Sequence, residues 1–311
     1  MISIKDLTKL EIESLLRNAR LYREKGAPTI SQGCRVGLIF AEPSTRTAMS
    51  FEEALRELRL RYIDLDMSRS SVLKGESLDD TIRMMELYCS ILIVRTSTEL
   101  TSKSSKHTLI NAGDGTNEHP TQALIDLLTL EDALGRSYKN VCVLGDAKNS
   151  RAIHSFLYCI TSMRSDLSVT VVAPADLQLP DQVHRAIWGQ GSAHSHIRKV
   201  ESLDQVDAKI IDVLYVTRKH KEREQDCLPE SDYPIVTPEF VNSLKETAVI
   251  LHPLPRQAEL PVSIDRDKRA HYMKQARNAL PMRIAIIERV LGKMNHVHDS
   301  IENVLSILGI V

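Results

Sequence analysis

The chain has 311 residues, of which 42% are hydrophobic, and this composition predicts a soluble globular protein with room for two domains. Lys and Arg number 40 and Asp and Glu 41, which leaves a net charge of -1 and argues against a general basic surface for nucleic acid or anionic lipid. Five scattered cysteines argue against a disulfide framework, and the sequence lacks both a signal-peptide core and a membrane-length apolar run, so we expect a cytoplasmic protein.

The first elements lead to an anion-binding turn. Thr8 and Glu11 have the spacing of a capping box at the start of a helix that runs to about Glu24. A short apolar run from Val36 to Phe40 predicts a buried parallel strand, and Ser44 is a good N-cap for the next helix. Because the first turn of a helix presents unpaired N–H groups and the positive end of its dipole, this turn predicts a phosphate or carboxylate site.

The next two strands end at further polar residues. A strand from Tyr62 to Asp66 precedes a polar, cationic loop, 68–77, which is usually only a solvated connection. After a helix that starts near Leu78, the apolar strand Ile91 to Val94 ends at Arg95. Open α/β sheets bind ligands outside the carboxyl ends of their strands, so Arg95 is well placed to face a ligand.

A fourth strand signal, Thr108 to Asn111, precedes a loop that ends in His119 and Gln122, where a helix through Leu134 begins. A lone histidine in a loop is more often structural, but this one follows a strand at the same predicted sheet edge. Gly135 ends the unit, and we place the domain boundary directly after it.

The pattern then restarts with a strand at 141–144 and a turn into a helix at Arg151. This turn contains one glycine where a dinucleotide-binding fingerprint needs three, so it does not predict a pyrophosphate site. A strand at 167–172 and a helix at 181–190 follow. The strand Val213 to Val216 then leads into Thr217-Arg218-Lys219-His220-Lys221-Glu222-Arg223, a candidate for binding a second anion.

Near the end of the chain, a strand at 249–251 runs into His252-Pro253-Leu254-Pro255-Arg256, where two prolines fix a loop with free carbonyls and no N–H at the proline positions. Met282 to Leu291 marks a long helix, and residues 295–311 are predicted to add a short amphipathic tail. The fold class is α/β, with two doubly wound parallel-sheet domains whose cationic edges would face each other across a cleft. Such edges suit a reaction between a phosphorylated and a polyanionic small molecule, with no metal or cofactor required.

Five motifs together resemble one family. They are Ser-Thr-Arg-Thr at 44–47, Lys-Gly-Glu-Ser at 74–77, His-Pro-Thr-Gln at 119–122, Thr-Arg at 217–218 and His-Pro-Leu-Pro-Arg at 252–256. In order and spacing they resemble the catalytic chains of aspartate carbamoyltransferases. The resemblance implies a carbamoyl phosphate-binding domain at 1–135, completed by a C-terminal helix at 278–311, and an aspartate-binding domain at 136–277. It also implies a homotrimer with shared active sites, acting in de novo pyrimidine biosynthesis.

The resemblance implies a role for each matching position. Carbamoyl phosphate would be bound by Ser44, Thr45, Arg46, Thr47, Arg95, His119, Gln122 and the Pro253, Leu254 and Pro255 loop, and among these Arg46, Thr47, Arg95 and His119 would be catalytic. Aspartate would be bound by Arg151, Arg218, His220 and by Lys74 from a neighbouring subunit, while Glu42 would pair with Arg151 and Arg223 on domain closure.

Three departures from the family pattern keep alternatives open. His220 stands where the family usually has Gln, Ala48 where it has Arg, and Gln257-Ala258 where it has Val-Asp. A histidine can still donate or accept a hydrogen bond near aspartate. The alternatives are carbamoyl transfer to another amino acid such as ornithine, a non-catalytic relative, and, with little support, a nucleotide-dependent dehydrogenase. Whether a regulatory chain is a further partner is left open.

Overall fold

The computed structural model describes residues 1–30, 34–67, 75–100, 109–188, 196–220 and 233–307. The chain divides into two compact units, one formed by residues 1–114 and 280–311 and the other by residues 115–279. Among the described residues, no helix combines the length and hydropathy needed to span a bilayer.

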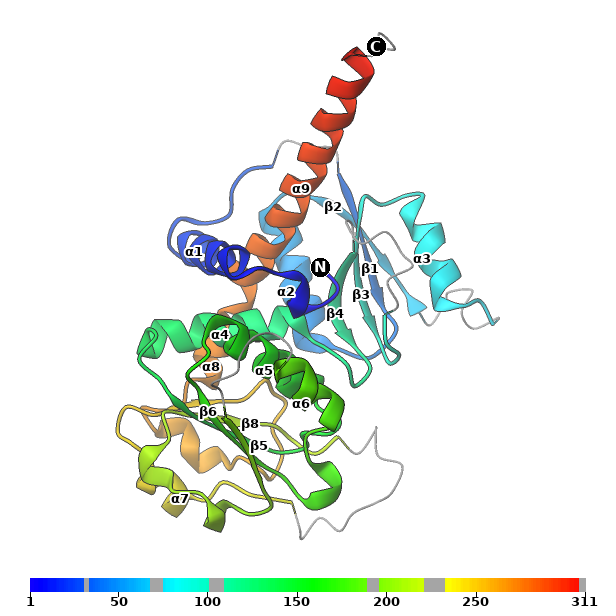
Figure 1. Cartoon of the computed structure of the whole chain (residues 1–311). Helices are drawn as coiled ribbons and strands as arrows, with labels where there is room; N and C mark the ends of the chain where they lie inside the picture. The colour runs from blue at the N-terminus through cyan, green and yellow to red at the C-terminus, as the bar shows by residue number, and fades with distance from the viewer. Residues whose placement is uncertain (31–33, 68–74, 101–108, 189–195, 221–232, 308–311) are drawn as a thin grey trace. The chain divides into compact units, whose positions relative to one another are not determined.

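The first unit is built on a four-stranded parallel sheet in the order β2-β1-β3-β4. Ile82 and Met85 of α3 pack against Ile39 and Leu92 on one face of this sheet. Figure 1 shows α1 and α2 on the opposite side from α3. The bounds are α1 Lys9–Lys25, β1 Arg35–Phe40, α2 Thr45–Glu57, β2 Arg61–Leu65, α3 Leu78–Glu86, β3 Ile91–Thr96 and β4 Leu109–Asp114.

The second unit has a five-stranded parallel sheet in the order β7-β6-β5-β8-β9. Alternate residues of β8 face opposite helix layers. The Tyr215 ring stacks on the Phe156 ring of α5, with 4.2 Å between the ring centroids. Leu214 instead joins a core cluster with Val241 of α7 and Tyr272 of α8. The bounds are α4 Pro120–Leu134, β5 Asn140–Leu144, α5 Arg151–Met163, β6 Ser168–Val172, α6 Asp181–Trp188, β7 His196–Val200, β8 Val213–Val216, α7 Pro238–Ser243, β9 Val249–Leu251 and α8 Tyr272–Arg277.

The last helix, α9, runs from Ala279 to Ile307 and returns the chain to the first unit. Its Arg283 is buried, and the guanidinium lies 4.3 Å from the centroid of the Phe51 ring in α2. Its Arg289 and Lys293 both pair with Glu11 of α1. The predicted separate tail after residue 295 is therefore a continuation of one helix, as far as residue 307.

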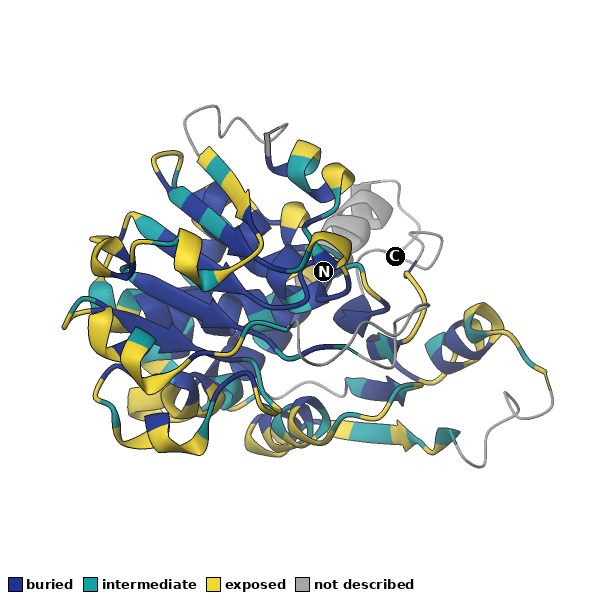
Figure 2. Cartoon of the chain, turned by 90° about the horizontal axis from the view of Figure 1, so that it is seen from below, coloured by how far each residue is buried: buried dark blue, intermediate teal, exposed yellow. Residues whose placement is uncertain are grey.

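The predicted fold class is confirmed, since both sheets are parallel and carry helices on their faces. Most strands are buried, as Figure 2 shows, but the edge strands β2 and β7 are more exposed. The capping box at Thr8 and Glu11 is formed in both directions. Ser44 is the N-cap of α2 as predicted, but its hydroxyl makes no capping hydrogen bond.

Candidate active site

The turn from β1 into α2 carries the first predicted group of residues. Ser44 precedes the helix, Thr45 and Arg46 are exposed in its first turn, and Thr47 is buried. The Ser44 hydroxyl does not cap the helix, so it makes no hydrogen bond to the N–H groups of the first turn. Both the hydroxyl and these N–H groups can therefore bind a ligand. This turn therefore has the chemistry of an anion site at a helix N-terminus.

Arg95 lies beside this turn because β3 pairs with β1 in parallel, with Phe40 and Arg95 in register. Its guanidinium donates to Glu42 Oε1 at 3.3 Å and to the Pro43 carbonyl at 3.5 Å. A further hydrogen bond reaches the Ala112 carbonyl at 3.5 Å. The Arg95 and Glu42 side chains are only 13% and 19% exposed, so this ion pair holds the arginine at the carboxyl edge of the first sheet.

In the second unit, His119 and Gln122 stand at the start of α4, as predicted. His119 is buried at the N-cap position, and its backbone N–H donates to Ser155 Oγ of α5 at 2.8 Å. Its ring Nδ1 lies 3.3 Å from Thr121 Oγ1. Gln122 Nε2 donates to the buried carboxylate of Asp126 at 2.6 Å. Both side chains are thus positioned by neighbours within the same unit.

Arg151 begins α5, which is capped by the Ser150 side chain. The arginine is 4% exposed and donates to the Gly115 carbonyl at 3.3 Å. The ring of His154 lies between two carbonyls, that of Asn117 at 3.2 Å and that of Ala147 at 2.8 Å. Burial lowers the pKa of His154, although these carbonyls oppose the shift. The loop before α4 is in this way tied to the turn before α5.

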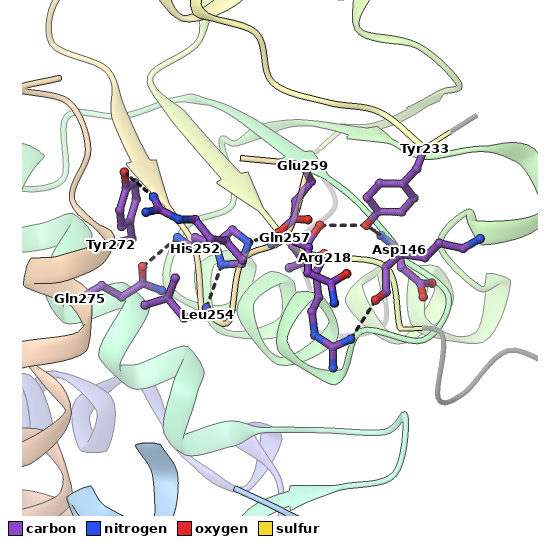
Figure 3. A network of polar contacts seen from close by, with 12 residues as sticks. Asp146, Arg218, Tyr233, His252, Leu254, Gln257, Glu259, Tyr272 and Gln275 are labelled. Carbon is purple, nitrogen blue, oxygen red and sulfur yellow. Dashed lines mark hydrogen bonds and ion pairs between the residues drawn. The ribbon is translucent and has the colours of Figure 1, made fainter. Parts of the chain in front are cut away.

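The segment after β8 is also anchored to the turn before α5. The backbone N–H of His220 donates to Asp146 Oδ2 at 3.1 Å. The Tyr233 hydroxyl accepts from the Asp146 N–H and donates to the Thr217 carbonyl, both at 2.8 Å (Figure 3). Arg218 donates to the Lys219 carbonyl at 2.9 Å. These bonds fix the direction in which the chain leaves β8.

The loop after β9 is held by a buried pair. His252 Nδ1 accepts from the Leu254 N–H at 2.8 Å, which leaves the proton on Nε2, and Nε2 donates to Glu259 Oε1 at 2.9 Å (Figure 3). Burial raises the pKa of Glu259, but hydrogen bonds from His252 and the Gln257 amide outweigh this effect and lower it. Leu254 has φ +56, a left-handed conformation that is unusual for leucine. The pair thus maintains the backbone shape of the loop that contains Pro253 and Leu254.

In the first unit, the predicted residues lie at or follow the carboxyl ends of the neighbouring strands β1 and β3; they are Glu42, Ser44, Thr45, Arg46, Thr47 and Arg95. In the second unit, the residues that follow β5, β8 and β9 are Arg151, Arg218, His220, Pro253, Leu254 and Pro255. His119 and Gln122 also belong to the second unit, but the strand that precedes them is β4 of the first sheet. Lys74 and Arg223 lie outside the described residues.

Sequence reasoning missed the groups that hold these residues, namely the buried Asp126, Asp146, Glu259 and Gln275 and the partly buried Tyr233. One signal was available. Asp126 interrupts the run Leu124-Ile125-Asp126-Leu127-Leu128, and a carboxylate within a buried apolar stretch needs hydrogen-bond donors.

Two family models match the chain. Residues 1–132 match the carbamoyl-P binding domain of aspartate/ornithine carbamoyltransferase, and residues 137–290 match the Asp/Orn binding domain of the same family.

Individual relatives agree with these models. The aspartate carbamoyltransferase catalytic subunit of Methanocaldococcus jannaschii is 38% identical over 305 residues, covering 94% of this chain and 97% of the relative. That of Haloarcula marismortui is 35% identical over 310 residues, covering 94% and 97%. The multifunctional protein CAD of Squalus acanthias is 36% identical, but the chain spans only 13% of its length.

A solved structure of aspartate transcarbamoylase from Trypanosoma cruzi in complex with N-(phosphonacetyl)-L-aspartic acid has a TM-score of 0.85. Its sequence is 31% identical, and the match covers 92% of this chain and 94% of that one. These matches confirm the resemblance found in the sequence motifs. The chain therefore belongs to the aspartate/ornithine carbamoyltransferase family.

Proposed function

We propose that the protein transfers the carbamoyl group of carbamoyl phosphate to the α-amino group of L-aspartate. The products are N-carbamoyl-L-aspartate and phosphate, and the reaction would serve de novo pyrimidine biosynthesis in the cytoplasm. The supporting observation is that a chain matching both domains of this family carries arginines and polar groups at the carboxyl edges of both sheets. Relatives named for this reaction support the same choice.

In this proposal the first unit binds the phosphate. The first-turn amides of α2 and the hydroxyls of Ser44, Thr45 and Thr47 hold its oxygens, while Arg46 and Arg95 supply positive charge. Arg95, Thr47 and His119 also stabilise the carbonyl oxygen as it gains negative charge, which lowers the barrier because these donors need no reorganisation.

The second unit would bind the carbamoyl amino group and the acceptor. Gln122 and the Pro253 and Leu254 carbonyls accept from the carbamoyl N–H groups, while Arg151, Arg218 and His220 bind the aspartate carboxylates. The α-amino nitrogen then attacks the carbonyl carbon, the bond from that carbon to the phosphate oxygen breaks, and the leaving phosphate takes the amino proton. Holding the two reactants in the correct orientation provides much of the rate enhancement.

The alternative acceptor, ornithine, is favoured less. Its side-chain ammonium would need acidic partners, whereas the predicted ligand groups at the second sheet edge include Arg151 and Arg218. The Asp146 carboxylate at the same edge is buried and already accepts from the His220 and Asn149 N–H groups. A non-catalytic relative remains the alternative suggested by His220 and Gln257-Ala258. An assay of phosphate release from carbamoyl phosphate, with either aspartate or ornithine as the acceptor, distinguishes these two alternatives from the proposed function.

The direct test is Arg46→Ala, compared with Arg56→Ala on the same helix. Arg56 is exposed and pairs with Glu52 and Glu53, so its loss should leave activity near that of the unchanged protein. Loss of the Arg46 guanidinium should lower kcat/KM by about a hundredfold or more, with the fold intact by circular dichroism. Near-normal turnover in Arg46→Ala would refute the proposal.

We also propose a homotrimer in which Lys74 completes the site of a neighbouring subunit. Mixing inactive Lys74→Ala chains with inactive His119→Ala chains should then restore part of the activity, since some mixed sites would contain neither substitution. Mixed trimers that form but stay inactive would instead assign Lys74 to its own chain's site. Sedimentation of the protein alone tests the trimer itself.

A further inference from the structure

A buried carboxylate joins two groups that the proposed function assigns to the carbamoyl amino group. Asp126 is fully buried in α4. Its Oδ1 accepts from Gln122 Nε2 and from Gln275 Nε2, both at 2.6 Å, and its Oδ2 accepts from the Tyr215 hydroxyl at 2.8 Å. The carboxylate therefore receives donors from α4, α8 and β8.

The first of these bonds sets the orientation of the Gln122 amide. Asp126 Oδ1 is an acceptor, and it already accepts a hydrogen bond from Gln275. The NH₂ group of Gln122 can therefore face it, whereas the Gln122 carbonyl oxygen would be repelled because it is also an acceptor. Within the described part of the chain, the Gln122 side chain has no other hydrogen bond than the one to Asp126. Oε1 is thus the end of the amide left to a ligand, and it can only accept.

The second bond extends the same control to the loop after β9. With its Nε2 held by Asp126, Gln275 presents Oε1 to the backbone N–H of His252 at 2.9 Å. Figure 3 shows Gln275 beside His252 and Leu254 at this loop. Since Leu254 is in turn held by His252 Nδ1, the carbonyls of this loop are positioned through the chain of bonds that starts at Asp126.

We propose that Asp126 is a positioning residue that makes the site select donors bearing an amino group, by fixing Gln122 Oε1 and the loop carbonyls as acceptors. The inference rests on the proposed function, in which these acceptors meet the carbamoyl N–H groups. A donor with a methyl group in place of the amino group would leave all of them without a partner. The site should therefore reject acetyl-type donors, and Asp126 should be required for that rejection.

The test uses two unreactive ligands that differ only at this position. Phosphonoacetamide carries an amide NH₂, and 2-oxopropylphosphonate carries a methyl group in its place. Titration calorimetry on the full chain gives a Kd for each, and the ratio of the two measures selectivity. If Asp126 had a purely structural role, replacing it would weaken the binding of both ligands equally and leave the ratio of their Kd values unchanged.

In Asp126→Ala we expect the preference for the amide ligand to fall about tenfold, because Gln122 can then turn its NH₂ group toward the ligand. Tyr215→Phe is the matched control: it removes a hydrogen bond to the same carboxylate but leaves both glutamines bound, so its ratio should stay unchanged. If the alanine variant does not fold, Asp126→Asn, which keeps one acceptor oxygen for three donors, should still lower the ratio about threefold or more.

Gln122→Met separates this inference from the function on which it rests. It should lower the preference by about tenfold or more if Gln122 binds the amino group, while the loop carbonyls retain the rest. If Gln122→Met loses selectivity while the folded Asp126 variants keep it, the role of Asp126 is overturned and the proposed function stands. If Gln122→Met keeps the full preference, the assignment of Gln122 fails, and the inference about Asp126 fails with it.

Discussion

Gly145, in the turn between β5 and α5, offers a sharp test of how the second unit positions Arg218. Its φ is +135, and a Cβ placed there would lie 2.4 Å from Thr217 Oγ1 and 2.5 Å from the Thr217 carbonyl oxygen. It would also lie 2.8 Å from the Tyr233 hydroxyl. Each distance is below van der Waals contact, and two of the three atoms belong to the residue that directly precedes Arg218.

Gly145→Ala should therefore destabilise the protein by about 3–6 kcal/mol. The disfavoured φ costs about 1–2 kcal/mol. Overpacking against the Thr217 backbone costs about 1–3 kcal/mol. Displacing the Tyr233 hydroxyl, which donates to the Thr217 carbonyl, costs about 1 kcal/mol more. This sum is a large share of the roughly 5–15 kcal/mol that keeps a typical protein folded.

Urea unfolding followed by circular dichroism measures this loss. Gly292→Ala is the control, since Gly292 lies in α9 with nothing within 4 Å of an added Cβ, and there alanine should stabilise by about 0.5–1 kcal/mol. Since Arg218 follows Thr217, the KM for aspartate should rise more than the KM for carbamoyl phosphate. The reasoning is refuted if Gly145→Ala unfolds at the same urea concentration as the unchanged protein with an unaltered KM for aspartate.

Two further predictions concern buried or paired carboxylates. Burial raises the pKa of Glu11, but the Thr8 amide, Lys293 and Arg289 together lower it to about 2 from 4.5. Stability from this group is thus present above about pH 4.5 and is lost toward pH 2, so Glu11→Gln should flatten the acid-unfolding curve in that window; an unchanged slope would contradict it. Glu259→Ala should cost about 3 kcal/mol in urea unfolding because the buried His252 Nε2–H loses its acceptor, whereas Glu259→Gln, which keeps one, should cost about 1 kcal/mol; equal losses would refute this pairing.

The sequence predicted the strands whose ends carry the candidate site. Val213 to Val216 matches β8 residue for residue, and Ile91 to Val94 lies within β3, which continues through Arg95. Buried parallel strands are continuous apolar runs, which makes them visible without any partner. The strand β7 was missed, because His196–Val200 is an exposed edge with one buried residue and no such run.

The helix starts show the same division between local and distant information. Thr8 and Glu11 form the predicted capping box, whose two partners are three residues apart. Ser44 occupies its predicted position, but it has Thr47 rather than Glu or Gln three residues on, and its hydroxyl makes no capping bond. A pattern of residues places an N-cap but does not determine which way its side chain turns.

The sequence by itself determined the two parallel sheets and the candidate residues at their edges, because apolar runs and linked motifs are properties of neighbouring residues. Only the tertiary structure decided what holds those residues in place. Asp126 meets Tyr215 from 89 positions away and Gln275 from 149. A buried carboxylate is stable only with donors around it, and those donors come from whichever segments the fold packs there, which no local pattern records.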